Sequence, residues 1–246
     1  MCGIIGYVGN RSASRIVLEG LKNLEYRGYD SWGIAFQGRE LKEKDMVKKI
    51  NVRKDIGRIS CVDMNDFENH KSTCSIGHTR WATHGGVEKR NAHPHLSQEN
   101  SIAVVHNGII ENYQDLKEEL AALGYQFRSG TDSEVLPLLI GHYTKQGNSF
   151  EEAVICSLDK IEGNYAIVAI NSEDNVMIGA RRGSPLVIGI GNNEYFIASD
   201  TLAFIKHTNK VIYLKENEMV IINGEVNEKI SLSENLSEKN PHHQES

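Results

Sequence analysis

Two spacings of apolar residues divide the start of the chain into short segments. The almost continuous apolar run from Ile4 to Val8 predicts a buried strand. Val17, Leu21 and Leu24 then follow at helical spacing, so we expect a helix that buries one face. The stretch from Ser31 to Phe36 has the pattern of a strand again. The pattern therefore predicts strand, helix and strand over the first part of the chain.

Charged residues dominate between Arg39 and Arg58. Six Lys or Arg residues lie between these two positions, among four Asp or Glu residues. A basic cluster of this kind could bind phosphate or nucleic acid. Mixed signs are more typical of a solvated face, and we interpret the segment in this way.

Capping patterns predict three further helices. Asn112 precedes an apolar stripe that ends at Gly124, which is typical of a capped helix with a glycine stop. The four-residue patterns that start at Thr131 and Ser149 match the capping box and should open two more helices. Pro137 lies inside the first of these two, and we expect it to kink that helix.

From Tyr165 onward the chain changes to short β-rich runs separated by Gly, Asn and Asp turns, typical of meander strands. Strands at both ends with helices between them predict an α+β fold, most simply two packed sheets flanked by helices. After about Gly224 the pattern becomes polar. We therefore assign residues 1–225 to one domain and residues 226–246 to a linker or disordered tail.

The charge and cysteine content limit the partners and the setting. The net charge of -6 offers no footprint for nucleic acid or an anionic membrane, so we expect a small-molecule substrate. The four cysteines lie far apart and include no CxxC pair, which favours the reducing cytoplasm. No apolar run approaches the roughly 18 residues of a membrane span, and the pattern of a cleaved signal is lacking.

Cys2 is the most informative candidate for chemistry, because it directly follows the initiator methionine. Removal of Met1 would leave one residue with both a thiol and a free α-amine. The amine, with a pKa near 8, could take the proton of a thiol whose pKa is near 8.5. The alternative is that Cys2 only begins a buried strand, since free cysteine is common in protein cores.

Two charged residues could hold the ends of an amino acid. Arg80 follows a strand-like run, and a guanidinium can bind a carboxylate through two hydrogen bonds. Asp132 could bind an ammonium group, although it also fits a first-turn acid favoured by the helix dipole. The loop after Arg80 either adds hydroxyl and backbone donors to a ligand site or is a polar loop with an aromatic anchor.

Asn107 and Gly108 lie between two apolar runs and have two interpretations. Asn-Gly in this setting is a strong signal for a hairpin turn. The same pair could form an oxyanion hole, if the side-chain amide of Asn107 and the backbone N–H of Gly108 point at one oxygen. The interpretations exclude each other only if Asn107 points to solvent.

Two further segments have competing explanations. Five histidines lie within 29 residues: His78, His84, His93, His95 and His106. No pair has the HExxH spacing and Pro94 separates the closest pair, so we disfavour a zinc site and expect no cofactor. In the segment from Glu25 to Ser31, a glycine C-cap with a basic last turn explains Arg27 and Gly28, but not the neighbouring tyrosines and acid.

These segments, in this order, resemble the class II glutamine amidotransferase domain, which is an N-terminal-nucleophile hydrolase. Several branches of that family share the start Met-Cys-Gly-Ile. The remaining segments are most similar to the glutaminase domain of the hexosamine branch, glucosamine-6-phosphate synthase, or glutamine:fructose-6-phosphate aminotransferase (isomerising). They are Glu25–Ser31, His78–Gly85, Asn91–His95, Val105–Asn112 and Arg182–Gly189. The resemblance extends from Cys2 to about Asn223.

The resemblance implies a four-layer αββα sandwich of two mainly antiparallel sheets between helical layers. It also implies hydrolysis of L-glutamine to glutamate and ammonia through a γ-glutamyl thioester on Cys2, whose α-amine would carry the proton to the departing ammonia. Asn107 and Gly108 would hold the tetrahedral oxyanion, a contribution of roughly 3 kcal/mol per donor by analogy with other acyl-transfer sites.

The remaining roles implied by the resemblance concern substrate binding. Arg80 would bind the α-carboxylate of glutamine and Asp132 its α-ammonium group, while Arg27 would steady the site near the nucleophile. The loop that closes over the substrate would consist of Trp81, Thr83, His84 and Gly85.

Two features depart from the family's pattern. Relatives continue into a region that isomerises a sugar phosphate, and no motif for fructose 6-phosphate is present here, so we expect an isomerase domain or chain as partner. Residues 86–90 and Trp32 are atypical beside the substrate loop. Two alternatives to the glutaminase remain: a non-catalytic glutamine-binding regulatory module, and a stand-alone amidotransferase subunit that serves a separate synthase chain.

Overall fold

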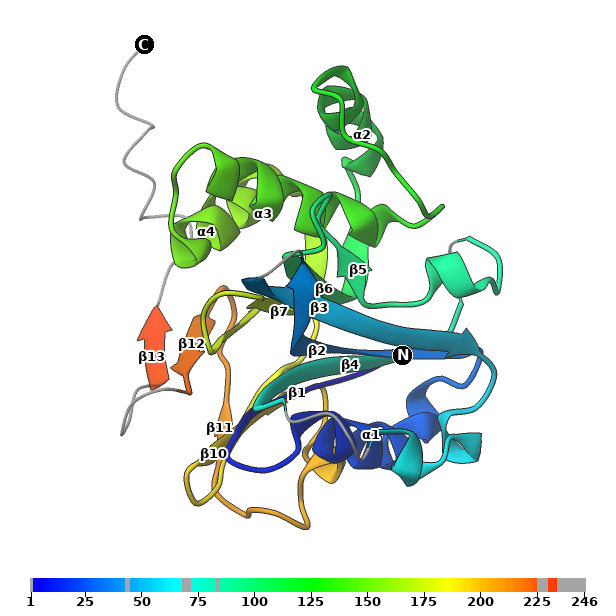
Figure 1. Cartoon of the computed structure of the whole chain (residues 1–246), viewed down its shortest axis with the longest axis vertical. Coiled ribbons are helices and arrows are strands. Elements are labelled where there is room, and N and C mark those ends of the chain that lie inside the picture. Colours follow the sequence, from blue (N-terminus) through cyan, green and yellow to red (C-terminus); the bar gives the residue numbers. More distant parts are fainter. Residues whose placement is uncertain (1, 43–44, 68–71, 83–84, 225–229, 234–246) are drawn as a thin grey trace.

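Two antiparallel sheets pack face to face, with helices on both outer faces (Figure 1). The computed structural model describes residues 2–42, 45–67, 72–82, 85–224 and 230–233. The predicted α+β class and the four-layer αββα sandwich are confirmed. Within the described residues, no helix is long and apolar enough to cross a membrane.

The first sheet has seven strands in the order β11-β9-β10-β1-β4-β2-β3, and each neighbouring pair is antiparallel. Its strands are β1 (Gly3–Gly9), β2 (Ser31–Lys42), β3 (Asp45–Ile56), β4 (Cys74–Arg80), β9 (Val187–Ile190), β10 (Glu194–Ala198) and β11 (Val211–Tyr213). Strand β1 therefore lies in the middle of the sheet, between β10 and β4. The charged segment after Arg39 contains the edge strand β3, which the sequence pattern did not predict.

The second sheet has six strands in the order β13-β12-β8-β7-β6-β5. They are β5 (His95–Leu96), β6 (Ile102–Ile110), β7 (Gly163–Asn171), β8 (Val176–Arg182), β12 (Met219–Asn223) and β13 (Ile230–Ser233). The predicted meander is split, because β7 and β8 pair in this sheet whereas β9 and β10 pair in the other. Strand β13 pairs with β12, so part of the predicted linker or tail, residues 226–246, is an edge strand instead.

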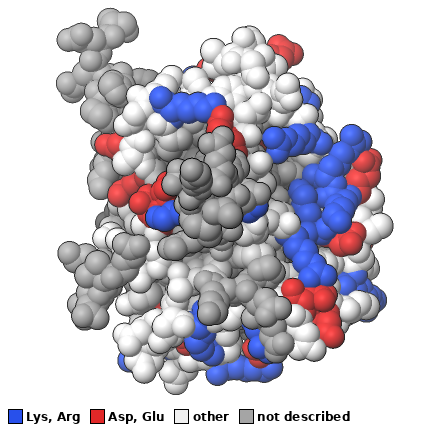
Figure 2. All heavy atoms as spheres, in the orientation of Figure 1, with Lys and Arg blue, Asp and Glu red and all other residues white. Residues whose placement is uncertain are grey.

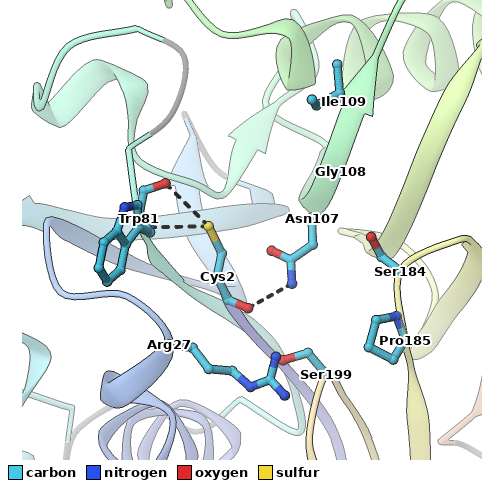
Figure 3. Close-up of a pocket in the computed structure, with 9 residues that line it drawn as sticks. All are labelled: Cys2, Arg27, Trp81, Asn107, Gly108, Ile109, Ser184, Pro185 and Ser199. Carbon is cyan, nitrogen blue, oxygen red and sulfur yellow. Dashed lines mark hydrogen bonds between the residues drawn. The ribbon is translucent and has the colours of Figure 1, made fainter.

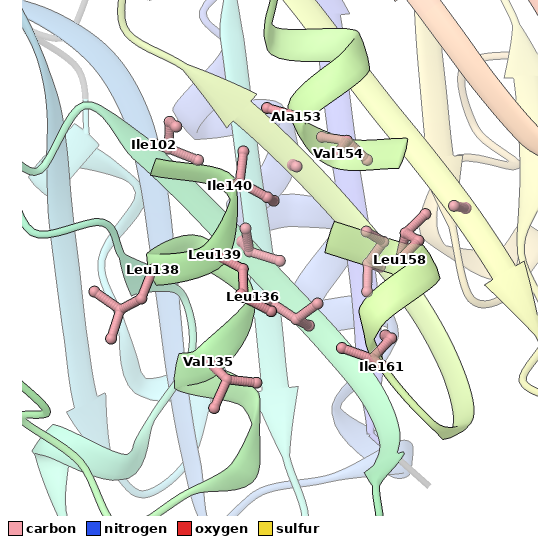
Figure 4. Close-up of a cluster of buried hydrophobic side chains, with 14 of the residues drawn as sticks. Ile102, Val135, Leu136, Leu138, Leu139, Ile140, Ala153, Val154, Leu158 and Ile161 are labelled. Atoms are coloured by element: carbon pink, nitrogen blue, oxygen red, sulfur yellow. The ribbon is translucent and has the colours of Figure 1, made fainter. Parts of the chain in front are cut away.

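The helices bury one apolar face each, except that the helix beginning at Val135 buries every residue as far as Gly141. The helices are α1 (Ala13–Asn23), α2 (Tyr113–Ala122), α3 (Val135–Lys145) and α4 (Phe150–Lys160). Helix α1 covers the outer face of the first sheet, while α3 and α4 cover the second (Figure 1). The second helical layer is the more apolar, and Leu136, Ile140 and Leu158 pack there against strand residues such as Ile102 (Figure 4).

A separate apolar layer fills the space between the two sheets. Ile4 and Ile76 of the first sheet and Val105 and Val168 of the second belong to this cluster, and all are essentially inaccessible to solvent. Alternate residues of β1, such as Ile5, pack instead under α1. Period-two burial on a strand covered on both faces explains the continuous apolar run from Ile4 to Val8.

Short 3-10 turns connect the main elements. They are η1 (Glu25–Arg27), η2 (Ile59–Cys61), η3 (Met64–Phe67), η4 (Lys89–Asn91), η5 (Asp132–Glu134) and η6 (Thr201–Ala203). Gly28 is the C-cap residue of η1 and Arg27 lies in its last turn, as expected, but the backbone of Gly28 is extended with φ of -177°, so a left-handed cap does not explain the glycine. A Cβ at Gly28 would lie 2.7 Å from the backbone carbon of Arg80, and the close approach of two chain segments explains this glycine.

The capping box predicted at Ser149 is confirmed, and so is the glycine stop after α2, where Gly124 has a φ of +88°. Ser149 and Glu152 form the reciprocal capping box of α4. The pattern at Thr131 opens the short turn η5 without a side-chain cap, because the Glu134 carboxylate accepts hydrogen bonds from the backbone of residues 128 and 129. Asn112 precedes α2, but its side chain bonds to the main chain of residues 160 and 162. Pro137 lies in the first turn of α3, where backbone N–H groups have no partner within the helix. A proline there removes no helix hydrogen bond, so there is no reason for the expected kink.

Candidate active site

Cys2 lies directly before the central strand β1 and is half-buried. The backbone N–H of Trp81 donates to the Cys2 sulfur at 3.2 Å, and the thiol lies 3.7 Å from the Trp81 carbonyl oxygen (Figure 3). Two hydrogen bonds of 3.0 Å fix the start of the strand: the Ile4 N–H donates to the Ser199 hydroxyl, and the Ser199 N–H donates to the Ile4 carbonyl oxygen. The sulfur is therefore held in a defined place rather than on a loose chain end.

The ionisation of the Cys2 thiol responds to opposing influences. Burial raises its pKa, because a thiolate is poorly solvated there. The Trp81 N–H and the positive charge of Arg80 act in the opposite direction, whereas the negative charge of Asp30 raises the pKa further. The net shift is upward, so the thiol is protonated at neutral pH and needs a base to become a nucleophile.

Asn107 and Gly108 lie within β6, paired with β7, so the hairpin-turn interpretation is wrong. Gly108 has a φ of +139°, and a Cβ on it would lie 1.9 Å from the Asn164 carbonyl oxygen. The side-chain amide of Asn107 turns toward the nucleophile, and its Nδ2 donates to the Cys2 carbonyl oxygen at 2.9 Å (Figure 3). An amide nitrogen has two N–H groups, so a second donor is available beside Cys2.

His78 fixes the orientation of the Asn107 side chain. Its Nε2 lies 3.0 Å from Asn107 Oδ1 and 3.2 Å from the His106 carbonyl oxygen. Both partners are acceptors, so Nε2 carries the proton and donates. Burial lowers the pKa of His78 to about 3, so the imidazole is neutral and its Nδ1 accepts from His93 Nδ1 at 3.3 Å.

Four of the five histidines form one buried cluster behind Asn107. The ring centroid of His93 lies 4.3 Å from that of His78, 4.6 Å from that of His95 and 6.5 Å from that of His106. Burial lowers the pKa of all four, so these imidazoles are neutral. Within the described part of the chain, which excludes His84, no group of three or more His, Cys, Asp or Glu residues could hold a metal ion.

A cavity of about 270 Å³ opens beside the nucleophile. It is lined by Cys2, Arg27, Trp81, Asn107, Gly108, Ile109, Ser184, Pro185 and Ser199 (Figure 3). Five of these residues are ones that the sequence singled out for the site. Residues from both sheets thus meet at one place, because the start of β1 lies opposite the end of β6.

Arg27 and Trp81 form the wall on the side of the first helix. Arg27 is largely buried, and its guanidinium donates to Asp200 at 2.8 Å and to the Tyr26 hydroxyl at 3.2 Å. The Trp81 indole is 45% exposed and packs edge-on against Tyr29, with ring centroids 5.4 Å apart. The tyrosines that the C-cap interpretation left unexplained therefore position both of these residues.

Arg80 and Asp132 lie near this cavity but do not line it. Arg80 ends β4, is only 4% exposed, and donates to the Gly86 and Gly85 carbonyl oxygens at 3.3 and 3.4 Å. Asp132 Oδ2 accepts from the Ile110 N–H at 2.8 Å, two residues beyond Gly108. Burial lowers the pKa of Arg80, while the charges of Cys2, Asp30 and Asp132 raise it. Thr83 and His84 lie outside the described residues.

Four positioning residues were not assigned a role at the site from the sequence. Asp30 accepts from the Ala82 N–H at 2.9 Å and so fixes the chain just after Trp81. Ser199 and Asp200 follow β10, where neither spacing nor composition indicates a site. His78 was seen only as a possible metal ligand, since its pairing with Asn107 depends on the contact between two sheets.

The fold and the sequence define a glutamine amidotransferase. Residues 78–206 match the family model described as the glutamine amidotransferase domain, which is more than half of the chain. The chain therefore belongs to this family of enzymes. Within the family it corresponds to the glutaminase domain of its hexosamine-branch relatives, whose N-terminal part it matches.

Curated relatives are named glutamine–fructose-6-phosphate aminotransferase (isomerizing). The protein of Methanothermobacter thermautotrophicus is 47% identical over 229 residues, which is 92% of this chain and 37% of the relative. The protein of Chlorobaculum tepidum is 47% identical over 225 residues, with 90% and 36% covered. The chain thus spans little more than a third of the length of these relatives.

The fold is also found in solved structures. The glutamine phosphoribosylpyrophosphate amidotransferase of B. subtilis, complexed with ADP and GMP, superposes with a TM-score of 0.75 and 31% identity over 95% of this chain. A second structure, described as the allosteric regulatory enzyme of purine biosynthesis, gives 0.76 and 32%. This chain covers 49% of each, so in both proteins the shared fold is one part of a longer chain.

Proposed function

We propose that this chain hydrolyses L-glutamine to glutamate and ammonia with Cys2 as the nucleophile. One observation carries the proposal: the Cys2 sulfur and the Asn107 amide line the same cavity, and the amide N–H lies 2.9 Å from the Cys2 carbonyl oxygen. A nucleophile with a fixed donor beside it is the arrangement that acyl transfer requires. Membership of the amidotransferase family supports glutamine as the substrate.

The reaction has two steps. In the first, the Cys2 sulfur attacks the carboxamide carbon, the carbon–nitrogen bond breaks, and ammonia leaves with the proton of the thiol. The tetrahedral oxygen is stabilised by the second N–H of Asn107 and by the Gly108 N–H, each worth about 3 kcal/mol at comparable sites. In the second step water attacks the thioester carbon, which releases glutamate and restores the thiol.

The base of the first step is the α-amine of Cys2. It exists only after Met1 has been removed, because in the encoded chain the Cys2 nitrogen belongs to an amide. An amine with a pKa near 8 matches a thiol whose pKa is raised by burial, and it can return the proton to the departing ammonia. The neutral His78 is not a competing base, since its Nε2 already donates to Asn107.

The charged ends of glutamine are assigned to Arg80 and Asp132. Arg80 is buried at the end of β4, and its guanidinium responds to the charges of both Cys2 and Asp132. A carboxylate on Arg80 and an ammonium group on Asp132 would hold an α-amino acid by both charges. Trp81, with Thr83, His84 and Gly85 of the following segment, is assigned to the loop over the substrate, and Arg27 to the wall.

The acceptor of the ammonia is proposed to be a sugar phosphate bound by an isomerase domain or chain. The names of the curated relatives support fructose 6-phosphate, and this chain spans only 37% of the length of one of them. Co-purification with a sugar-phosphate isomerase, and glutamine-dependent amination of fructose 6-phosphate by the mixture, would support this acceptor. If fructose 6-phosphate is not aminated either by a longer chain that contains an isomerase domain or by a mixture with a separate isomerase chain, this acceptor is excluded.

Intact mass spectrometry with a diazoketone analogue of glutamine tests the glutaminase. We expect a chain without Met1 that gains one adduct and loses all ammonia release. Cys2→Ala should abolish both, whereas the matched variant Cys61→Ala, at an exposed cysteine, should retain both. Ammonia release that survives in Cys2→Ala would refute the mechanism, and retention of Met1 in an active chain would refute the role of the amine. Glutamine binding without turnover would favour the regulatory module.

A further inference from the structure

A second cavity, of about 430 Å³, shares no lining residue with the cavity at Cys2. Five cationic side chains line it: Arg53, Lys54, Lys89, Arg90 and Arg128. They come from three segments far apart in the sequence, namely strand β3, the turn η4 and the loop before η5. Figure 2 shows Lys and Arg side chains gathered on the right of the view, with Asp and Glu among them.

Two unexplained sequence features meet in this basic cavity. The charged stretch after Arg39 contributes Arg53 and Lys54, whereas Lys48 and Lys49 do not line the cavity. The atypical residues 86–90 contribute Lys89 and Arg90. The interpretation of a solvated face holds for Arg53 and Asp55, which are exposed, but not for Lys54, which is partly buried and converges with four other cations.

Lys54 is the deepest of the five cations. Its Nζ donates to the Ala92 carbonyl oxygen at 2.8 Å, and the Pro94 and Arg90 carbonyl oxygens lie 3.4 and 3.5 Å away. Burial lowers the pKa of Lys54 to about 8, and the neighbouring charges of Arg128 and Lys89 lower it further, against the carboxylate of Glu134. The protonated side chain is therefore poorly solvated and faces two cations besides Glu134, so an anion at this place would stabilise it.

Three of the other four cations have ion pairs that a ligand could replace, and the fourth, Arg128, donates to Asn100 Oδ1 at 3.0 Å. Arg53 pairs with Asp66 at 2.7 Å, Lys89 with Asp55 at 3.8 Å and Arg90 with Glu88 at 2.6 Å. Both partners of each pair are at least 41% exposed, and pairs of this kind contribute about 0 to 1 kcal/mol. Exchange for a phosphate group therefore costs little.

Glu134 is the carboxylate that lines this cavity, and it is already engaged. It is 3% exposed and accepts hydrogen bonds from the N–H groups of Arg128 and Ser129 and from the Ser129 hydroxyl. Its lone pairs are directed at the backbone of this loop. Asp55, Asp66 and Glu88 pair with three of the cations, so together with Glu134 four carboxylates face five cationic side chains, and the cavity keeps a positive excess in a chain whose net charge is -6.

We propose that this cavity binds a small phosphorylated metabolite with at least two negative charges. Lys and Arg side chains are the usual protein groups for phosphate, and a volume of about 430 Å³ suits a ligand of nucleotide size. Val52 and Leu96 supply an apolar wall for a ring or sugar portion. The overall negative charge argues against a long nucleic acid as the ligand.

Isothermal titration calorimetry on the full chain at low salt tests this site, with orthophosphate, pyrophosphate and ADP as probes. We expect pyrophosphate or ADP to bind with a Kd below about 1 mM, more tightly than orthophosphate, and to weaken as salt is added. Lys89→Gln with Arg90→Gln should weaken binding roughly tenfold or more. The matched pair Lys206→Gln with Lys210→Gln removes the same charge elsewhere and should bind as the wild type does.

Three results would overturn the proposal. The first is no binding of pyrophosphate or ADP, or no gain over orthophosphate. The second is equal affinity of the wild type and the Lys89–Arg90 double variant, while circular dichroism shows both to be folded. The third is a single-stranded oligonucleotide that binds far more tightly than ADP, which would make the surface a nucleic-acid site.

Discussion

His78 Nε2 donates a hydrogen bond to Asn107 Oδ1 at 3.0 Å, and this bond turns the Asn107 amide nitrogen toward Cys2. The two residues lie on different sheets, His78 on β4 and Asn107 on β6. The contact between the sheets therefore sets which end of the amide faces the nucleophile. A protonated His78 would donate from both nitrogens and break its bond with His93, but its low pKa prevents this at neutral pH.

Asn107→Ala should lower kcat for glutamine hydrolysis by roughly 10²- to 10³-fold, because one oxyanion donor is lost. The KM should change little, since the carboxamide oxygen of the bound substrate needs this donor less than the transition state does. Steady-state assays of glutamate formation measure both constants. Ser184→Ala, which changes another residue of the same cavity, is the control. An Asn107 variant with normal kcat would remove the oxyanion hole from the mechanism.

His78→Leu should lower kcat by roughly tenfold or more, through misorientation of the Asn107 amide. His78→Gln retains a donor at this place and should recover part of the loss. Because His78 is fully buried, the thermal midpoint of each variant must be measured by circular dichroism. Equal kcat in the two variants, with both folded, would show that His78 serves packing alone.

Arg80→Gln and Asp132→Asn should each raise the KM for glutamine, by about 10- to 100-fold for the loss of a hydrogen bond between charged groups. Asp132→Asn keeps an oxygen that can accept from the Ile110 N–H, so the fold around η5 should persist. Diazoketone labelling at saturating concentration should still occur at Cys2. Unchanged KM values in both variants would contradict the assigned roles.

Gly108→Ala should destabilise the protein by roughly 3 kcal/mol or more, because the new Cβ meets the Asn164 carbonyl oxygen and φ is positive. Gly124→Ala is the matched control, with a φ of +88° and no atom within 4 Å of the new Cβ. It should cost only about 1 kcal/mol. Urea denaturation of both variants measures the difference, and equal losses would show that crowding at Gly108 is unimportant.

The histidine cluster should make the domain sensitive to acid. The pKa of His78 is about 3 in the folded chain and near 6.5 when unfolded, so the unfolded state binds more protons between these values. Stability is therefore complete above pH 6.5 and is lost as the pH falls, by about 2 kcal/mol at pH 5 from His78 alone. The lowered pKa values of His93, His95 and His106 act in the same direction. Urea midpoints that do not fall between pH 7.5 and pH 5 would contradict this.

Local sequence signals predicted the elements well where one interaction decides the structure. The apolar run at Ile4 became β1, and the capping box at Ser149 became the start of α4. The same four-residue pattern at Thr131 failed, because the Glu134 carboxylate found backbone donors on its other side. Strand β3 was missed since an edge strand carries charged residues that mask the alternation.

The candidate site was predictable in its residue types but not in its arrangement. The resemblance indicated Cys2, Asn107 and Arg27, and the structure places all three around one cavity. Partners such as His78 and Asp200 depend on contacts between segments more than 25 residues apart, and a single sequence does not specify these. The hairpin turn predicted from Asn107 and Gly108 was wrong for a physical reason: a glycine with a positive φ, such as Gly108, can occur inside a strand as well as in a turn.

The central position of β1 has a practical consequence for producing the protein. Chain ends are usually loose and tolerate additions, but here the first residues are held on both sides by β10 and β4. An affinity tag before Cys2 would have to start inside the cavity and would keep the nitrogen acylated. Purification tags therefore belong at the other end, and a protein recovered by an N-terminal tag should be assayed only after cleavage that leaves Cys2 first.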